Sequence, residues 1–327
     1  MIRFGTFVPQ GWLREFRDTK ESGKEWDSIK KFAIEADRLG FYSICLYDHF
    51  ITFPELTTEP CFECWTTLSS LAPLTTKVKL FQLVTCQSHR SPALLAKMAA
   101  TLDTISGGRL ELGIGAGWGK KEHEAYGIPF EEKPSVRIKQ MKEAVQILIK
   151  MWTEDKPTFR GKYYTIVEAI NNPKPIQKPH PPIYVGGRGK QLTLKVAAQL
   201  ADGTNLGGRC SVKDAEEALI ALKKHCAEVG RDFDGITKSY ESEFTIIDED
   251  KTNVQNKIKK YMPRITLGKP TRVEDFISWN LIGTPHEIID RIQEYVDVGI
   301  DYFILRFPDG LEIEPLQLFA DEVMSSF

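Results

Sequence analysis

The sequence predicts an α/β protein, a (β/α)8 TIM barrel that forms one domain over residues 1–327 and has insertions in the loops after its strands. Short β-branched or aromatic segments alternate along the chain with amphipathic segments of about 12 to 18 residues, which indicates a parallel sheet. Eight such alternations match the number of strands that closes a TIM barrel. The expected strands are 2–8, 42–47, 78–85, 109–114, 182–186, 201–206, 236–247 and 301–306. No low-complexity stretch or hydrophilic linker divides the chain.

Capping residues mark the starts of several helices between these strands. Ser91-Pro92 pairs an N-cap with a proline at the first helical position, and Gly107-Gly108 ends the helix. Thr284-Pro285-His286-Glu287 has the pattern of a capping box. Ser211 and Asp214 open another helix, which presents alanines and leucines on one side.

Two regions interrupt the alternation. Residues 115–180 contain a loop, a helix around 134–152 and the start of a proline-rich stretch over 172–182, which we expect to be extended because proline prevents regular ladder pairing. Residues 248–283 lack a clean period. Long irregular excursions in a compact domain are often functional lids.

Composition excludes several classes of protein. Lys and Arg (43) nearly balance Asp and Glu (45), for a net charge of −2, so no basic surface indicates a nucleic-acid partner. No apolar run approaches the roughly 18 residues of a membrane-spanning helix. The N-terminus leads directly into a strand-like segment without a signal-peptide pattern, so we expect a cytoplasmic location and no membrane association.

The six cysteines do not indicate a disulfide scaffold in so long a chain. Cys61 and Cys64 have C-x-x-C spacing, but a structural zinc site usually needs a second such pair, and the sequence has none. Cys45, Cys86, His49 or His89 would complete a metal site only if the fold happened to bring them there. We therefore expect no metal and interpret this segment as helix packing.

Asp48-His49 is the candidate catalytic segment. It follows the second predicted strand, and the carboxyl ends of barrel strands face the active site. Imidazole titrates near pH 6.5, so His49 is suited to proton transfer at neutral pH. Position alone is equally compatible with a histidine that caps a loop.

Two glycine-rich segments are candidate cofactor sites. Residues 113–119 fail the G-x-G-x-x-G pattern of a dinucleotide fold, although their glycines would permit close approach of a flat ligand or simply form a tight turn. Residues 186–190 (Gly-Gly-Arg-Gly-Lys) follow the fifth predicted strand and open a helix, which favours phosphate binding over a plain turn. This segment is not a P-loop, because Gln191 follows the lysine.

Taken in order, the segments of this chain resemble the luciferase-like monooxygenase superfamily, and within it the coenzyme F-420-dependent oxidoreductases. The resemblance runs along nearly the whole chain and rests on residues 6–12 (TFVPQGW), 47–50 (YDHF), 90–97 (RSPALLAK), 99–118 (AATLDTISGGRLELGIGAGW), 186–187 (GG), 201–205 (ADGTN) and 283–285 (GTP).

The resemblance implies an oxidoreductase that moves a hydride between a deazaflavin (coenzyme F-420) and a small-molecule substrate. The alternative is an FMN-dependent monooxygenase, and a non-catalytic member is a third possibility that the presence of His49 argues against. The resemblance also implies a homodimer that forms through the helical side of the barrel.

The resemblance further implies roles for particular residues. His49 is the catalytic histidine. A non-proline cis peptide is implied near Leu83, Val84 and Thr85, behind the cofactor ring. The residues implied to bind the cofactor are Asp48, Val84, Thr85, Gly115, Ala116, Gly117, Gly186, Gly187, Arg188 and Gly189. Trp118 stands where the sugar-phosphate dehydrogenase branch has a glutamate, and Glu122 and Glu124 lie nearby in sequence without an assigned role.

Overall fold

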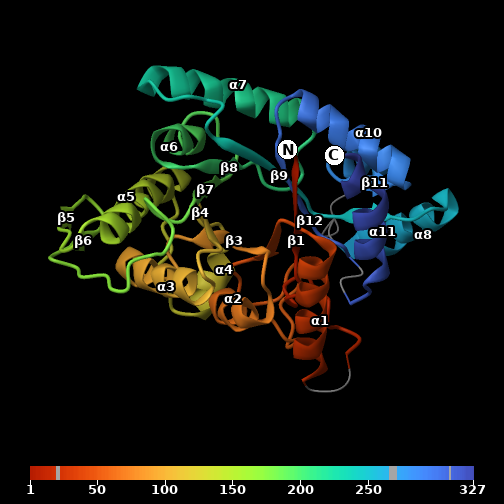
Figure 1. Cartoon of the computed structure of the whole chain (residues 1–327), viewed down its shortest axis with the longest axis horizontal. Coiled ribbons are helices and arrows are strands. Elements are labelled where there is room, and N and C mark those ends of the chain that lie inside the picture. Colours follow the sequence, from red (N-terminus) through yellow and green to blue (C-terminus); the bar gives the residue numbers. More distant parts are fainter. Residues whose placement is uncertain (20–22, 265–270, 309–310) are drawn as a thin grey trace.

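The computed structural model describes residues 1–19, 23–264, 271–308 and 311–327. Eight parallel strands form a closed barrel in the order β1-β12-β9-β8-β7-β4-β3-β2, surrounded by helices (Figure 1). The barrel strands are β1 (Arg3–Phe7), β2 (Ser43–Leu46), β3 (Lys79–Cys86), β4 (Leu110–Gly115), β7 (Ile183–Gly186), β8 (Gly203–Asn205), β9 (Thr237–Ser242) and β12 (Tyr302–Leu305). The predicted TIM barrel is confirmed, with a barrel strand in each of the eight expected segments, although β3 and β4 each end one residue beyond the predicted segment.

The barrel closes because β1 pairs with strands from both ends of the chain. Gly5 lies opposite Ile304 of β12 on one side and Ser43 of β2 on the other. Aromatic and aliphatic side chains fill the interior, and toward the amino ends of the strands the carboxylate of Glu111 accepts hydrogen bonds from three tyrosines. The barrel is thus a packed core, and the space for a ligand lies at its other end.

Helices cover the outside of the barrel with their apolar faces turned inward. They are α1 (Lys24–Leu39), α2 (Cys64–Leu71), α3 (Pro92–Ile105), α4 (Lys120–Ala125), α5 (Pro134–Thr153), α6 (Thr193–Leu200), α7 (Val212–Val229), α8 (Lys251–Tyr261), α9 (Val273–Ser278), α10 (Pro285–Asp297) and α11 (Glu314–Glu322), with short 3-10 turns at Ala72–Leu74, Met262–Arg264 and Met324–Ser326. The predicted starts of α3, α7 and α10 are confirmed. Ser91 caps α3, and capping boxes at Ser211 and Thr284 begin the other two.

One predicted strand proves to be two. The expected strand 236–247 divides into β9, which is part of the barrel, and β10 (Thr245–Ile247), which pairs outside it with β11 (Leu281–Gly283). The chain turns between them, where the Ser242 hydroxyl donates to the carbonyl of Phe244. β-Branched and aromatic residues on both sides of this turn hid the break in the sequence pattern.

The first excursion matches its prediction in part. The helix expected around 134–152 is α5, whereas α4 and a small hairpin of β5 (Phe159–Arg160) and β6 (Thr165–Ile166) were not predicted. The proline-rich stretch over 172–182 forms no strand, but it bends at 173, 176–179 and 181 and has cis peptides before Pro173 and Pro179, so it is not the extended segment that we expected.

The second excursion corrects our prediction. Residues 248–283 have regular structure in α8, α9 and β11, and residues 265–270 lie outside the described residues. Val254, Ile258 and Tyr261 of α8 are spaced as one helical face and pack in a small separate core. That face was missed because the lysines around it lower the local hydropathy.

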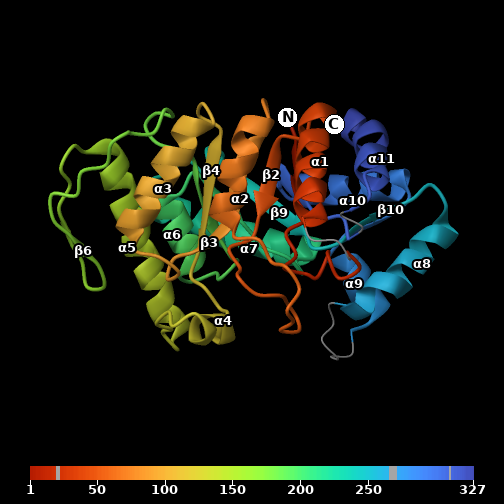
Figure 2. The same ribbon diagram turned by 90° about the horizontal axis from the view of Figure 1, so that it is seen from below.

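The two ends of the barrel differ in what they carry. Figure 2 shows both chain termini at one end and α4 and α9 at the opposite end. The latter is where the carboxyl ends of the strands lead into the longest loops. Across the described residues no helix is long and apolar enough to cross a membrane.

Candidate active site

A cavity of about 510 Å³ opens at the carboxyl ends of the barrel strands. It is lined by Trp12, Tyr47, Asp48, His49, Phe53, Leu83, Val84, Cys86, His89, Gly115, Ala116, Gly117, Trp118, Gly119, Glu122, Gly186, Gly187, Asn205, Gly207, Gly208, Arg209, Glu241 and Glu243. Eight predicted site residues are among them: Asp48, His49, Val84, Gly115, Ala116, Gly117, Gly186 and Gly187. Three others, Thr85, Arg188 and Gly189, do not line it.

His49 and Glu122 form a hydrogen-bonded pair on the cavity wall. His49 Nδ1 lies 2.9 Å from Glu122 Oε2, and the backbone N–H of Phe50 donates to the other carboxylate oxygen. Burial alone would raise the pKa of Glu122, but these hydrogen bonds and the charge of His49 outweigh it and lower the pKa. Because an ionised carboxylate only accepts, Nδ1 carries the proton of this bond, and Nε2 remains for a ligand.

Aromatic rings fix the position of the imidazole. Trp12 stacks on His49 with ring centroids 4.3 Å apart and planes 6° from parallel, and Trp118 meets it edge-on at 5.5 Å. Trp12, Tyr47 and Trp118 line the cavity. Phe50 and Trp65 do not line it: Phe50 packs on the ring of His89, and Trp65, on α2, is buried in the core.

Asp48 is buried and holds the loop after β3 in place. Arg90 binds its carboxylate at both oxygens, at 2.6 and 2.8 Å, and the Cys86 N–H donates to Oδ2 at 2.9 Å. Burial opposes ionisation, but the hydrogen bonds from Arg90 and the nearby ring of His89, whose Nδ1 lies 3.5 Å from Oδ2, hold the pKa of Asp48 well below its usual range. With both oxygens engaged in this way, Asp48 positions the site and is not suited to carry protons.

The predicted cis peptide is present between Leu83 and Val84, where the β3–β4 register also shifts. The Val84 side chain occupies the space above three glycines. A Cβ at Gly113, Gly115 or Gly186 would lie 2.8 to 2.9 Å from a methyl carbon of Val84. Gly113 and Gly115 of β4 are thus explained largely by this bulge, while Gly115 and Gly117 still line the cavity. Thr85 lies behind it, buried, and its hydroxyl donates to the side chain of Gln82.

The segment 186–190 meets the cavity through backbone, and its two cations face elsewhere. Arg188 donates to the carbonyls of Leu206, Gly208 and Arg209, and Lys190 pairs with Glu217 on α7. Helix α6 starts only at Thr193, and the Gly187 N–H is already bonded to the carbonyl of Asn205. Any anion here would therefore be bound by the N–H groups that follow Gly187.

Two carboxylates face the cavity, Glu241 from the end of β9 and Glu243 from the turn that follows it. Tyr47 donates to Glu241 at 2.8 Å, and Arg209 donates to Glu243 at 3.3 Å. Burial, together with the charge of Glu243, raises the pKa of Glu241 to about 7. Glu241 is therefore present as a neutral acid in part of the molecules at neutral pH.

Sequence reasoning missed Glu122 and Glu241. Glu122 lies 73 positions after His49, and only the packing of α4 against the loop after β2 brings them together. A glutamate near the carboxyl end of the seventh barrel strand was the available signal for Glu241.

Of the C-x-x-C pair, Cys64 begins α2 in the core, as expected for helix packing, and Cys61 donates to the His49 carbonyl.

The fold and the site define a (β/α)8 barrel with a histidine–carboxylate pair at the mouth of its cavity. A family model for luciferase-like monooxygenases matches residues 2–302, and the chain belongs to this family. Its relatives are oxidoreductases and monooxygenases that depend on coenzyme F-420 or a flavin, so the chain is an enzyme of this kind.

Relatives of both cofactor classes are similar to the chain. An F-420-dependent glucose-6-phosphate dehydrogenase of Segniliparus rotundus is 26% identical, over 90% of this chain and 92% of the relative. An FMNH(2)-dependent dimethylsulfone monooxygenase of Pseudomonas putida is 27% identical, over 94% and 90%. The coenzyme F-420-dependent tetrahydromethanopterin reductase structure from Methanopyrus kandleri superposes with a TM-score of 0.78 at 22% identity, over 100% of this chain and 99% of the other. That likeness shows the shared fold.

Proposed function

We propose that this enzyme transfers a hydride between coenzyme F-420 and a small organic substrate, with His49 as the proton donor or acceptor. The pair of His49 and Glu122 on the cavity wall carries the proposal. It offers a titratable nitrogen toward the cavity and a buried carboxylate behind it. The glutamate that one branch of the superfamily has at the position of Trp118 is therefore not needed for proton transfer.

The residues present fit a flat ring system with an anionic tail. A volume of about 510 Å³ lies within the usual range of roughly 300 to 1,000 Å³ for ligand pockets. One wall is formed by the Val84 bulge and by glycine backbone, which presents few side chains to a ring. At one edge, the backbone after Gly187 offers N–H groups but no carboxylate, as a phosphate requires.

When bound, coenzyme F-420 supplies the hydride donor or acceptor, and the protein handles the accompanying proton. For an alcohol substrate, His49 Nε2 takes the hydroxyl proton as the C–H hydride leaves, and for a carbonyl substrate it returns that proton. Glu122 accepts the hydrogen bond from Nδ1 and stabilises the imidazolium. Asp48 and Arg90 keep the loop that supports this wall in one position.

A cofactor titration of the purified protein tests the proposal. We expect coenzyme F-420 to bind at lower concentration than FMN, and we expect one molecule of it to bind per chain. Substrate-dependent loss of the visible absorbance of oxidised F-420 would then report turnover. Tighter binding of FMN, together with substrate-dependent oxygen uptake, would overturn the choice of cofactor.

An FMN-dependent monooxygenase is the second candidate, because the dimethylsulfone monooxygenase covers this chain as fully as the F-420-dependent relatives do. The same cavity serves either ring. Oxygen uptake separates the two functions, since hydride exchange with F-420 consumes none. The discriminating assay is an oxygen electrode trace with reduced FMN and with reduced F-420 in parallel.

A further inference from the structure

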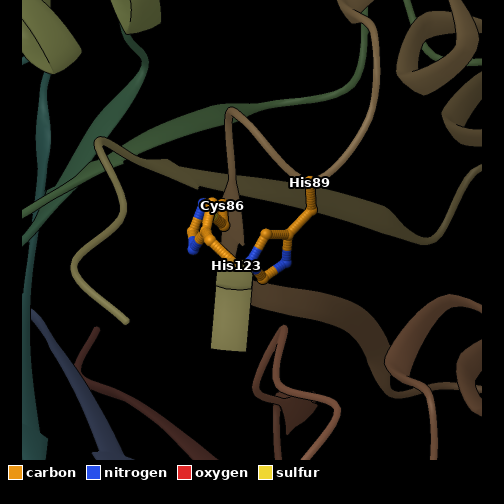
Figure 3. Close-up of side chains that lie close together, drawn as sticks. All are labelled: Cys86, His89 and His123. Carbon is orange, nitrogen blue, oxygen red and sulfur yellow. The ribbon is translucent and has the colours of Figure 1, made fainter. Parts of the chain in front are cut away.

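We propose that Cys86, His89 and His123 form a binding site for a single zinc-type divalent cation beside the cavity. Cys86 is the last residue of β3, His89 lies in the loop that follows, and His123 belongs to α4. Their side chains converge, as Figure 3 shows, and one candidate ligand atom from each lies within 4.8 Å of the others. Thiolate and imidazole are the ligands that zinc prefers in proteins.

The distance between two of the ligand atoms suits a shared ion. Cys86 Sγ and His123 Nε2 are 3.9 Å apart. Zn–S and Zn–N bonds of about 2.3 and 2.0 Å at a tetrahedral angle would separate the two atoms by about 3.5 Å. A shift of a few tenths of an ångström is within the freedom of the two side chains.

Hydrogen bonds orient both imidazoles for metal binding. His123 Nδ1 lies 2.9 Å from the carbonyl of Gly119, so this nitrogen carries the proton and Nε2 keeps its lone pair. His89 Nδ1 lies 3.5 Å from Asp48 Oδ2, and Figure 3 shows the other ring nitrogen on the side of Cys86 and His123. Metal-binding histidines usually donate their second N–H to a carbonyl or carboxylate in this way.

His89 also needs an explanation in its own right. Its side chain is 1% exposed, and among the described residues neither ring nitrogen has a hydrogen-bond partner. A buried polar group without a partner is costly, by about 1 to 3 kcal/mol, and often indicates an absent ion or water. A cation bound at Nε2 would satisfy this ring and shorten its contact with Asp48.

Three protein ligands leave a fourth position, as in catalytic rather than structural zinc sites. The Ser88 hydroxyl now lies between two of the ligands, 2.8 Å from His123 Nε2 and 3.2 Å from Cys86 Sγ. It would rotate away or become the fourth ligand. Cys86 and His89 both line the cavity, so a water or a substrate oxygen also has access.

Cobalt spectroscopy on the tag-free protein without organic cofactor tests the site. We expect one Co²⁺ per chain, with a thiolate-to-cobalt charge-transfer band that stoichiometric Zn²⁺ abolishes. Cys86→Ser should remove the band, and His123→Gln should weaken Zn²⁺ binding by more than the roughly 10- to 100-fold typical of an outer partner. Thermal melts of each variant confirm that it is folded.

Cys64→Ser is the matched control. Cys64 lies with Asp48 and Glu63 in a second group of possible ligands. If cobalt bound there, Cys64 would be the source of the thiolate-to-cobalt band. The control should bind as the wild type does. Absence of stoichiometric binding, a band that survives in Cys86→Ser, or a band lost in Cys64→Ser would each overturn the proposal, whichever organic cofactor the enzyme uses.

Discussion

At the scale of single residues, the proposed chemistry depends on the contrast between two buried carboxylates near His49. Glu122 shares a hydrogen bond with the imidazole, whereas Asp48 is held at both oxygens by Arg90. The first changes its interaction when His49 gains or loses a proton. The second cannot do so without breaking its contacts with the guanidinium, so we assign proton transfer to His49 and Glu122 and loop positioning to Asp48.

Replacement of His49 tests this assignment. His49→Gln keeps polarity and approximate size but cannot titrate, so we expect near-normal cofactor binding and a loss of turnover of roughly 100- to 10,000-fold, the usual range for general acid–base catalysis. Binding and single-turnover rates are measured separately. Glu122→Gln keeps an acceptor for Nδ1 and should fall between wild type and His49→Gln. Wild-type turnover in His49→Gln would make the histidine a packing residue only.

Glu241 makes the stability of the protein depend on pH. Its pKa is raised to about 7 in the folded state by burial and by Glu243, against about 4.3 in an unfolded chain. Between these values the folded state binds more protons, so its free energy of unfolding falls as pH rises. The whole effect is at most about 4 kcal/mol.

Glu241→Gln should therefore raise the free energy of unfolding at pH 8 relative to wild type and leave it nearly unchanged at pH 4. Urea unfolding at several pH values measures this. Glu243→Gln removes the neighbouring charge, so the pKa of Glu241 should fall toward its ordinary value. The decline in stability should then be smaller and end at lower pH than in the wild type. Equal pH dependence in wild type and Glu241→Gln would refute the assignment.

At the scale of elements, the loop between β7 and α6 is the part whose role can be tested most directly. Gly187 has a φ of +113°, which strains any other residue, so loss of function in one substitution would not by itself identify an anion site. A pair of variants separates the two effects. Gly187→Ala introduces the strain alone, and Gly187→Asp introduces the strain and a negative charge.

If the backbone after Gly187 binds the cofactor phosphate, Gly187→Asp should bind cofactor at least tenfold more weakly than Gly187→Ala. The cause is repulsion between the carboxylate and the phosphate at short range. Titrations at low and high salt measure it, and the difference should shrink as salt screens the charge. Equal affinities for the two variants would place the phosphate elsewhere.

The elements of the barrel were predictable from sequence to a greater extent than the site. Strand and helix positions follow from local patterns. The caps at Ser91, Ser211 and Thr284 each involve only residues within a four-residue segment. The break after Ser242 and the pairing of β10 with β11 depend on contacts between distant segments. The same holds for Glu122, whose role arises only once α4 packs beside the loop after β2.

The glycines of residues 113–119 lie at the predicted site, but the reason why glycine is needed there differs in part from the predicted one. Their sequence suggested close approach of a flat ligand, and Gly115, Gly117 and Gly119 do line the cavity. The structure adds that Gly113 and Gly115 make room for Val84 from the neighbouring strand. No local pattern in residues 113–119 contains that information, because the bulge belongs to β3.

At the scale of the whole molecule, the outer face of α3 is where we propose that two copies of the chain meet. Leu94 and Ile105 are 53% and 54% exposed, and Met98 is partly buried between them. Positions 94, 98 and 105 fall on one side of a helix of 3.6 residues per turn. An apolar stripe of this kind on a helix surface is more typical of an interface than of free surface.

The last prediction is therefore that the protein is a homodimer in solution, with a mass twice the 37.2 kDa of the chain. Sedimentation equilibrium or light scattering after gel filtration measures this mass. Leu94→Glu combined with Ile105→Glu should shift the protein toward the monomer, because each dimer would bury four unpaired carboxylates at its interface. Ile220→Glu on α7 is the control, since Ile220 is 64% exposed and lies on another helix. A monomeric wild type would remove the proposal, and a dimer that only Ile220→Glu disrupts would move the interface to α7.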